Sequence, residues 1–185
     1  MSNPGNLGFG LNVGGRREAV LLQSLTLVHP LASIVFDLPD NFTHIELLFL
    51  VRSNVAGTSA EMYVQFNSDA GANYDIILSQ AANGAHTGVA RVAQTVAYVA
   101  TINGDTATAG TASFGRLFVP YYLAQTYQHT CQSFATHKQG TAVGNLYEYF
   151  ASQWWRSTAP IRTMTFTLNG GSFMAGNEFS LYGLQ

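Results

Sequence analysis

The chain has 185 residues and a formal net charge of -2, and 10% of its residues are charged whereas 47% are hydrophobic. An average soluble domain carries about 25% charged residues. The low charge of this chain therefore favours a subunit packed against neighbouring molecules over a freely diffusing monomer. The slightly negative balance argues against a nucleic-acid-binding protein, which would show a basic footprint. The length suits one domain with a sizeable core.

The first segment, residues 1–16, is rich in glycine and asparagine and cannot bury enough surface to fold by itself. It has neither a basic start nor a long apolar run, so we expect no signal peptide and folding in a cytoplasm. Four apolar side chains nevertheless alternate at period two: Leu7, Phe9, Leu11 and Val13. Such a pattern can lie as an extended strand along a neighbour. We therefore predict that residues 1–16 form an extended anchor arm.

Residues 17–185 show the period-two alternation of β-strands, and this predicts an all-β fold with a single antiparallel β-sandwich domain. In the segment "MTFTLNG", for example, Met164, Phe166 and Leu168 face one side while threonines face the other. Strands are predicted, in chain order, at residues 20–28, 32–37, 43–52, 61–67, 94–102, 114–119, 127–137, 146–155, 164–170 and 178–184.

Three other segments complete the prediction. A short helical turn is predicted around residues 83–93, and the small-residue loop 103–113 is expected to project from a sandwich edge. The longest apolar stretch, residues 19–36, is interrupted by polar residues and by Pro30, so we expect no membrane span.

The segment "VQFNSDAGANYD" places oxygen-bearing side chains around one glycine, as a calcium loop does: Asn67, Asp69, Gly71, Asn73 and Asp75. An EF-hand loop needs an acidic ligand at its twelfth position, which is Leu78 when counted from Asn67, and its fifth position is Gly71 instead of a ligand. We therefore interpret the segment as a turn between two strands, in which Asn and Asp side chains cap their own backbone and Gly71 takes the left-handed conformation.

The histidines and the single cysteine form no metal-binding motif, and we predict no metal and no cofactor. No HxH or HxxxH pair occurs among His29, His44, His86, His129 and His137. His129 and His137 are expected on one face of one strand, about 26 Å apart by strand rise, which is too far to share an ion. Cys131 is expected to be a small buried hydrophobe.

The carboxylates do not mark a catalytic site either. Glu46 and Glu148 are expected in mid-strand, with Arg52, Arg156 and Arg162 available as partners. Because the two carboxylates of a glycosidase meet only in space, a hydrolase of surface polysaccharide stays open as an alternative. We predict no catalytic residues.

Aromatic side chains are dense in the segment "LYEYFASQWW", where Tyr147, Tyr149 and Trp155 share one side and Phe150 and Trp154 the other. Buried, such rings form a core; exposed, they form subunit contacts or platforms for sugars. We single out Tyr147, Tyr149 and Trp155 as candidate glycan-binding or interface aromatics.

Several segments, in this order, resemble a widespread group of tailed-bacteriophage virion proteins. They are "IVFDLPDNFTHIELLFLVRS", "QFNSDAGANYD" and "FASQWWRSTAPIRTMTFTLNGGSFMAGNEFSLYGLQ". The matching positions are Leu38-Pro39, Phe42-Thr43-His44, Arg52-Ser53, Phe66 to Tyr74, Pro160-Ile161 and Phe179 to Gly183. The resemblance covers about residues 20–185, so the arm lies outside it, and Pro160 before the usual isoleucine departs from the shared pattern.

The resemblance implies a jelly-roll-like β-sandwich that serves as a virion structural protein, and it implies no catalytic residues. We expect an accessory subunit of head-decoration or head-fibre type, located in the virion and not an enzyme. Its partners would be itself, commonly as a homotrimer, and the major capsid protein or another virion protein, with the arm as anchor to the particle or to the adjacent protomer. The alternative is a tail-fibre or receptor-binding module that recognises host-surface glycan on its aromatic side chains.

Overall fold

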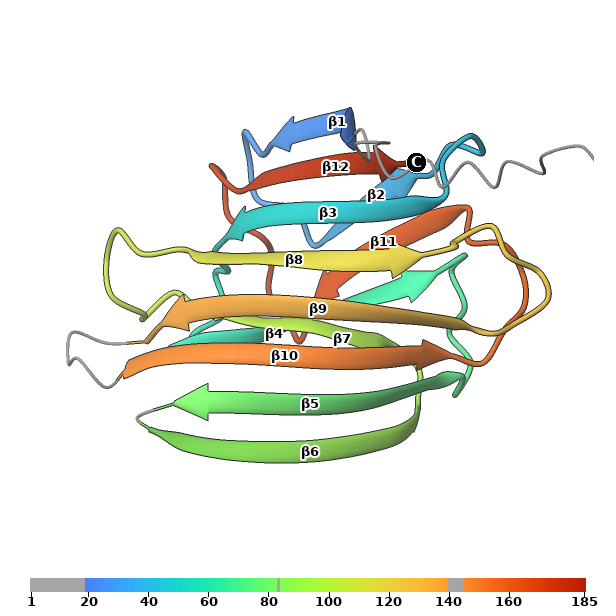
Figure 1. The fold of residues 1–185 in the computed structure, drawn as a ribbon. Coiled ribbons are helices and arrows are strands. Elements are labelled where there is room, and N and C mark those ends of the chain that lie inside the picture. Colours follow the sequence, from blue (N-terminus) through green and yellow to red (C-terminus); the bar gives the residue numbers. More distant parts are fainter. Residues whose placement is uncertain (1–18, 83, 140–144) are drawn as a thin grey trace, which may run out of the picture.

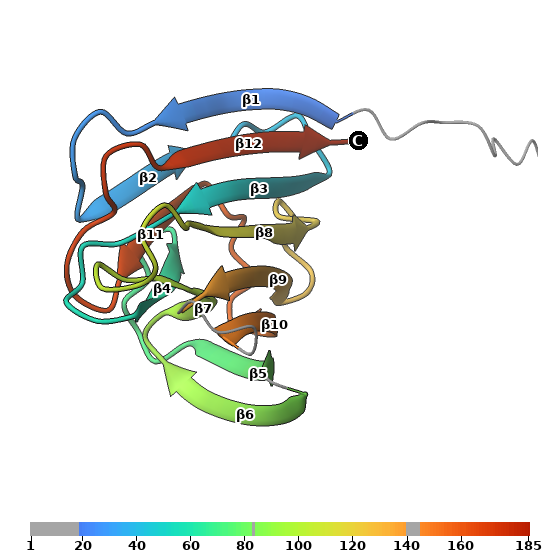
Figure 2. The ribbon, with the colours of Figure 1, turned by 90° about the vertical axis from the view of Figure 1, so that its left-hand side faces the viewer.

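The computed structural model describes residues 19–82, 84–139 and 145–185, and these form two antiparallel β-sheets packed face to face (Figures 1 and 2). The large sheet has eight strands in the order β1-β12-β3-β8-β9-β10-β5-β6, and the small sheet has four in the order β2-β11-β4-β7. The predicted all-β sandwich is therefore confirmed. The strand bounds are β1 Ala19–Thr26, β2 Ser33–Asp37, β3 His44–Val51, β4 Ser59–Phe66, β5 Tyr74–Ala82, β6 Ala85–Gln94, β7 Ala97–Asn103, β8 Ser113–Pro120, β9 His129–Lys138, β10 Leu146–Trp155, β11 Thr163–Leu168 and β12 Glu178–Leu184.

The connections between strands are those of a jelly-roll-like fold. Every strand of the small sheet is preceded and followed in the chain by strands of the large sheet, so the chain crosses the sandwich repeatedly. Only β5–β6 and β8–β9–β10 are joined within one sheet. No helix in the described part of the chain is long and apolar enough to cross a membrane.

Alternating side chains build the core between the sheets. The inward residues of β3, β4 and β11 are all buried, as their sequence pattern predicts: Ile45, Leu47, Phe49, Val51, Met62, Val64, Phe66, Met164, Phe166 and Leu168. Aromatic rings interlock among them, with Phe36 and Phe166 edge to face at 5.9 Å between centroids. Each large apolar side chain removed from water stabilises the fold by about 1.5–3 kcal/mol.

The strand β7 is an edge strand of the small sheet, and yet all seven of its residues are buried. It packs against β9, β10 and β5 of the wider sheet, and Figure 2 shows β5 and β6 closing the sandwich beyond it. Covering an edge strand in this way keeps its free backbone groups from pairing with another chain.

The structure corrects the prediction for residues 74–94. No helical turn lies at 84–93, because Ala85–Gln94 is strand β6. It pairs antiparallel with β5, and the sequence predicted no strand bounds for β5 either. All but two of the β6 side chains are exposed and none is buried. A strand exposed on both faces needs no apolar–polar alternation, which is why the period-two signal is missing there.

The loop between β7 and β8 is held close to the sandwich by Arg52. Its guanidinium donates four hydrogen bonds of 2.8–2.9 Å to the carbonyl oxygens of Asp105, Ala107, Thr108 and Thr111. The loop 103–113 was predicted to project from the sandwich edge, but these hydrogen bonds hold both halves of the loop close to the sandwich. The predicted arm, with Leu7, Phe9, Leu11 and Val13, lies outside the described residues, as do residues 17 and 18 of the predicted sandwich domain.

Gly115 in β8 lets Phe49 pack closely against the large sheet. A Cβ atom at this position would lie 2.3 Å from Cζ of Phe49 and 2.6 Å from the carbonyl oxygen of Phe134. We predict that Gly115→Ala lowers the free energy of unfolding by about 1–3 kcal/mol, because the core has to shift around the methyl group. Urea denaturation measures this. Gly88→Ala in β6 is the matched control, since its nearest atom would be 3.9 Å away; equal effects of the two substitutions would contradict the packing argument.

Candidate functional site

The segment 67–74 is a turn between β4 and β5, as predicted. Asn67 and Ser68, at φ 52° and 58°, take the left-handed conformation that the sequence analysis assigned to Gly71, so that detail was wrong. Gly71 is needed for space, because a Cβ atom there would lie 2.7 Å from Nδ2 of Asn73 and 3.0 Å from Oδ1 of Asp69. Asparagine tolerates the left-handed region better than most residues do.

Asp69 holds this turn together. Its carboxylate accepts hydrogen bonds from Nε1 of Trp155 at 2.7 Å, from the backbone N–H of Gly71 at 2.9 Å and from Nδ2 of Asn73 at 3.0 Å. Partial burial raises the pKa of Asp69, but these three hydrogen bonds outweigh it and hold the pKa below its usual value. The carboxylate is thus occupied by bonds within the chain, which gives it a structural role.

Two of the histidines lie on the same inner face of β9, as predicted, and both are buried. Nε2 of His129 is 2.9 Å from the carbonyl oxygen of Ala159. His137 stacks on Tyr147 and Tyr149 at 5.0 and 5.4 Å between centroids, and neither of its ring nitrogens has a partner in the described part of the chain. Burial lowers the pKa of His137 to about 4.

Cys131 is buried between these histidines in β9, and burial raises the pKa of its thiol to about 12, so it is the expected small hydrophobe. Among the residues that the structure describes, no group of three His, Cys, Asp or Glu side chains is placed to hold a metal ion.

The carboxylates pair differently from the prediction. Glu46 lies 3.4 Å from Arg116, and Arg156 lies 3.6 Å from Asp75. Arg52, which was expected beside a glutamate, binds the loop carbonyls described above.

A polar cleft of about 380 Å³ lies near Glu61 and Arg91. Arg91 forms a bidentate ion pair with Glu61 at 2.8 and 3.1 Å, and the hydroxyl of Tyr63 also donates to Glu61. The hydrogen bond from Arg91 holds the pKa of Glu61 low, although burial opposes it, while burial and Glu61 raise the pKa of Tyr63 to about 12. These charges neutralise one another, so none is left free to act on a ligand.

Of the three aromatic residues singled out from the sequence, two belong to the interior. Tyr149 is 6% exposed and Trp155 is 3% exposed, and Tyr147 is half-buried on the same inner side. Tyr149 and Trp155 cannot form a glycan platform on the surface, because Tyr149 packs against Tyr98 of β7 and Trp155 donates a hydrogen bond to Asp69 of the turn 67–74. The exposed rings of β10 are Phe150 and Trp154, at 47% and 46%.

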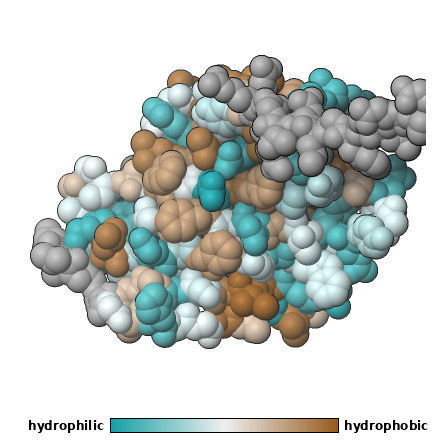
Figure 3. Space-filling model, viewed as in Figure 1, coloured by the Kyte–Doolittle hydropathy of each residue, from teal (hydrophilic) through white to brown (hydrophobic). Residues whose placement is uncertain are grey.

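Those two rings lie on the outer face of the large sheet, which no other described element covers and where hydrophobic side chains gather (Figure 3). The strand registers arrange this face in rows that cross the sheet. One row runs Leu48, Arg116, Phe134, Phe150, and the row on one side of it contains Leu50 and Phe114. The rows on the other side run Phe118, Gln132, Ser152, Ile77 and then Thr130, Trp154, Asp75.

The rows divide the outer face into two surfaces. We call Leu48, Leu50, Phe114, Phe134 and Phe150 the apolar patch. The rows of Ser152 and Trp154 line a groove of about 690 Å³, which we call the outer groove. The alternation in "LYEYFASQWW" predicted that Phe150 and Trp154 share a side, and it was the only sequence signal for these surfaces.

Comparison with family models, with curated proteins and with solved structures finds no match for this chain.

The Asp69 network predicts a specific loss of stability. We expect Asp69→Ala to lower the free energy of unfolding by about 2 kcal/mol or more, because it leaves the buried Nε1–H of Trp155 without an acceptor. Chemical denaturation measures the change. Asp105→Ala is the control, because only the backbone of Asp105 takes part in the hydrogen bonds of its loop. A loss at Asp69 no larger than that of the control would contradict the assigned role.

Burial of His137 predicts a pH dependence. Its pKa falls from 6.5 to about 4 on folding, so the unfolded chain binds a proton in this range that the folded protein does not. The free energy of unfolding should therefore decrease as the pH falls from about 6.5 to about 4. His137→Phe keeps a flat ring beside the two tyrosines and should flatten this dependence, measured by urea denaturation at a series of pH values. Exposed His86→Phe is the control, and identical curves for both variants would refute the prediction.

Proposed function

We propose that the protein is an accessory structural subunit of a bacteriophage virion, of head-decoration or head-fibre type. It acts by adhesion through buried surface and carries out no chemistry. The apolar patch is the observation that carries this proposal. The jelly-roll-like sandwich and the resemblance of residues 20–185 to virion proteins support the assignment to a virion.

The apolar patch has the properties of a protein contact surface. Leu50, Phe114 and Phe150 are 44%, 48% and 47% exposed on β3, β8 and β10. Half-buried Leu48 lies on β3, and half-buried Phe134 lies on β9, the strand between β8 and β10. Contiguous exposed apolar surface on a folded domain marks an interaction site, because each such side chain gains free energy when a partner removes it from water.

Charge at the patch is balanced. Arg116 lies within it and forms an ion pair with Glu46 at 3.4 Å. An exposed pair of this kind contributes at most about 1 kcal/mol to stability, but it offsets the charge of Arg116 within the patch. Arg116 can therefore enter a protein interface without becoming an unpaired buried charge. The partner is a virion protein, either the major capsid protein or a neighbouring copy of this chain.

Rebinding to particles tests the proposal. Virions of the phage that encodes the protein are prepared without it, and the purified protein is added and measured by co-sedimentation. We expect saturable binding, and we expect Phe114→Ser with Phe150→Ser to weaken it at least about tenfold, since two rings lose their burial. Val28→Ser, at a side chain that is 85% exposed outside the patch, is the matched control.

Two outcomes separate the parts of this proposal. Absence of the protein from purified wild-type virions would refute the virion role. Full binding by the patch variant, together with loss of binding when residues 2–15 are deleted, would move the attachment from the patch to the N-terminal arm.

A further inference from the structure

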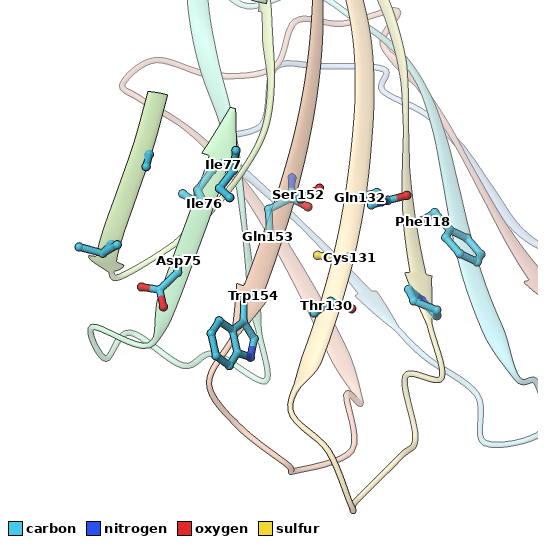
Figure 4. A pocket seen from close by; sticks show the side chains of 13 residues that line it. Asp75, Ile76, Ile77, Phe118, Thr130, Cys131, Gln132, Ser152, Gln153 and Trp154 are labelled. Atoms are coloured by element: carbon cyan, nitrogen blue, oxygen red, sulfur yellow. The ribbon is translucent and has the colours of Figure 1, made fainter. Parts of the chain in front are cut away.

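The outer groove is built from two adjacent cross-strand rows of the large sheet (Figure 4). Its middle is formed by small or short side chains, among them Ser152 and Thr130. Its rim is formed by larger ones, with Phe118 on one side and Trp154 and Ile77 on the other. The hollow therefore forms because the side chains in the middle of the rows are shorter than those at the rim.

The polar groups in this groove are free to bind a ligand. The side chains of Thr130, Gln132 and Ser152 and the Nε1–H of Trp154 make no hydrogen bond within the described part of the chain. The cleft near Glu61 differs in this respect, since its charged groups already bind one another. Uncommitted hydroxyl, amide and indole groups beside an exposed ring favour a ligand that has both hydrogen-bonding groups and an apolar face.

Charge restricts the ligand further. Asp75 is the one charged side chain among the described residues that line the groove. Its Oδ2 lies 3.6 Å from Arg156 and its Oδ1 accepts the backbone N–H of Ala93 at 2.8 Å. Phosphorylated or strongly acidic ligands would find no free cation among the lining residues, so the groove suits a neutral molecule.

The same chemistry continues past the end of the groove. Two further hollows share Thr130 with it, and one of them also shares Trp154. They are lined by the loop between β8 and β9, where Tyr121 and Tyr127 are 64% and 78% exposed beside amide and hydroxyl side chains. Exposed rings along these adjoining hollows, in which Asp75 is the one charged side chain among the described lining residues, fit an extended ligand with repeating units.

We propose that the outer groove binds a neutral saccharide chain. The ring of Trp154 stacks on the C–H face of one sugar, and Thr130, Gln132 and Ser152 exchange hydrogen bonds with its hydroxyl groups. The apolar patch, two residues further along each strand, remains the surface for protein contact. This inference goes beyond the virion role and does not depend on it.

A saccharide fits these observations better than a second protein chain does. Protein interfaces are centred on well-packed apolar anchors, which is the character of the patch. The groove is concave and mostly apolar, and a few uncommitted polar side chains lie among its apolar ones. Concave sites with a few placed polar groups are typical of small ligands and cofactors.

Isothermal titration calorimetry of the full chain tests the proposal. The probes are neutral hexasaccharides of glucose, mannose, galactose, xylose and N-acetylglucosamine, and a galacturonic acid hexasaccharide as the acidic comparison. We expect at least one neutral probe to bind saturably below about 10 mM and more tightly than the acidic one. Trp154→Ala should weaken this binding at least about tenfold.

Two more variants make the test decisive. Ser152→Phe fills the hollow without removing Trp154 and should also weaken binding. Leu146→Ala is the matched control, because Leu146 lies in the same strand at 53% exposure but outside both the groove and the apolar patch, and it should bind like the wild type. The proposal is overturned if no neutral probe binds, if Leu146→Ala loses as much affinity as Trp154→Ala, or if Trp154→Ala instead dissociates an oligomer in sedimentation. Particle rebinding by the patch variants reports on the virion role separately.

Discussion

The small sheet has half as many strands as the large sheet that it packs against, and most features of the molecule follow from this mismatch. The four strands of the small sheet cover the middle of one face of the eight-stranded sheet. Beyond β7 the large sheet closes over the edge of the small one, with Tyr98, Tyr149 and Ile76 filling the space between. The opposite face of the large sheet has no covering layer in the described chain. An extensive sheet face is thereby left to interact with other molecules.

Closing the sandwich around β7 places polar groups in the interior. Gln153 donates to Ser133 at 2.8 Å and to the backbone of Tyr98, but its Oε1 has no partner among the described residues, and His137 has none at either nitrogen. A buried polar group without a partner costs about 1–3 kcal/mol. The stacking of His137 on the rings of Tyr147 and Tyr149 offsets part of that cost, and burial keeps the imidazole neutral.

Long-range hydrogen bonds from side chains to the backbone, instead of ion pairs, fix the positions of the loops. Asn67 accepts the N–H of Arg162 at 2.7 Å and donates to the carbonyl of Pro160 at 2.9 Å, and Asn177 bonds both backbone groups of Arg52. These contacts explain how a chain with 10% charged residues can still order its connections. They also give Arg52 and Asn67 a role in the fold, as the hydrogen bonds of its carboxylate do for Asp69, so no ligand is needed to explain these residues.

The sequence by itself determined the fold class, most strand positions and the turn at 67–74, because alternation and turn residues are local properties. Strand β10 matches its predicted bounds, and Phe150 and Trp154 share a side as expected. Only the tertiary structure decided which side is buried. In β10 both sides carry aromatic rings, so alternation gives two equivalent solutions, and Tyr149 and Trp155 turned out to be inside. The choice depends on where β7 and the turn 67–74 pack, and those contacts join residues far apart in the chain.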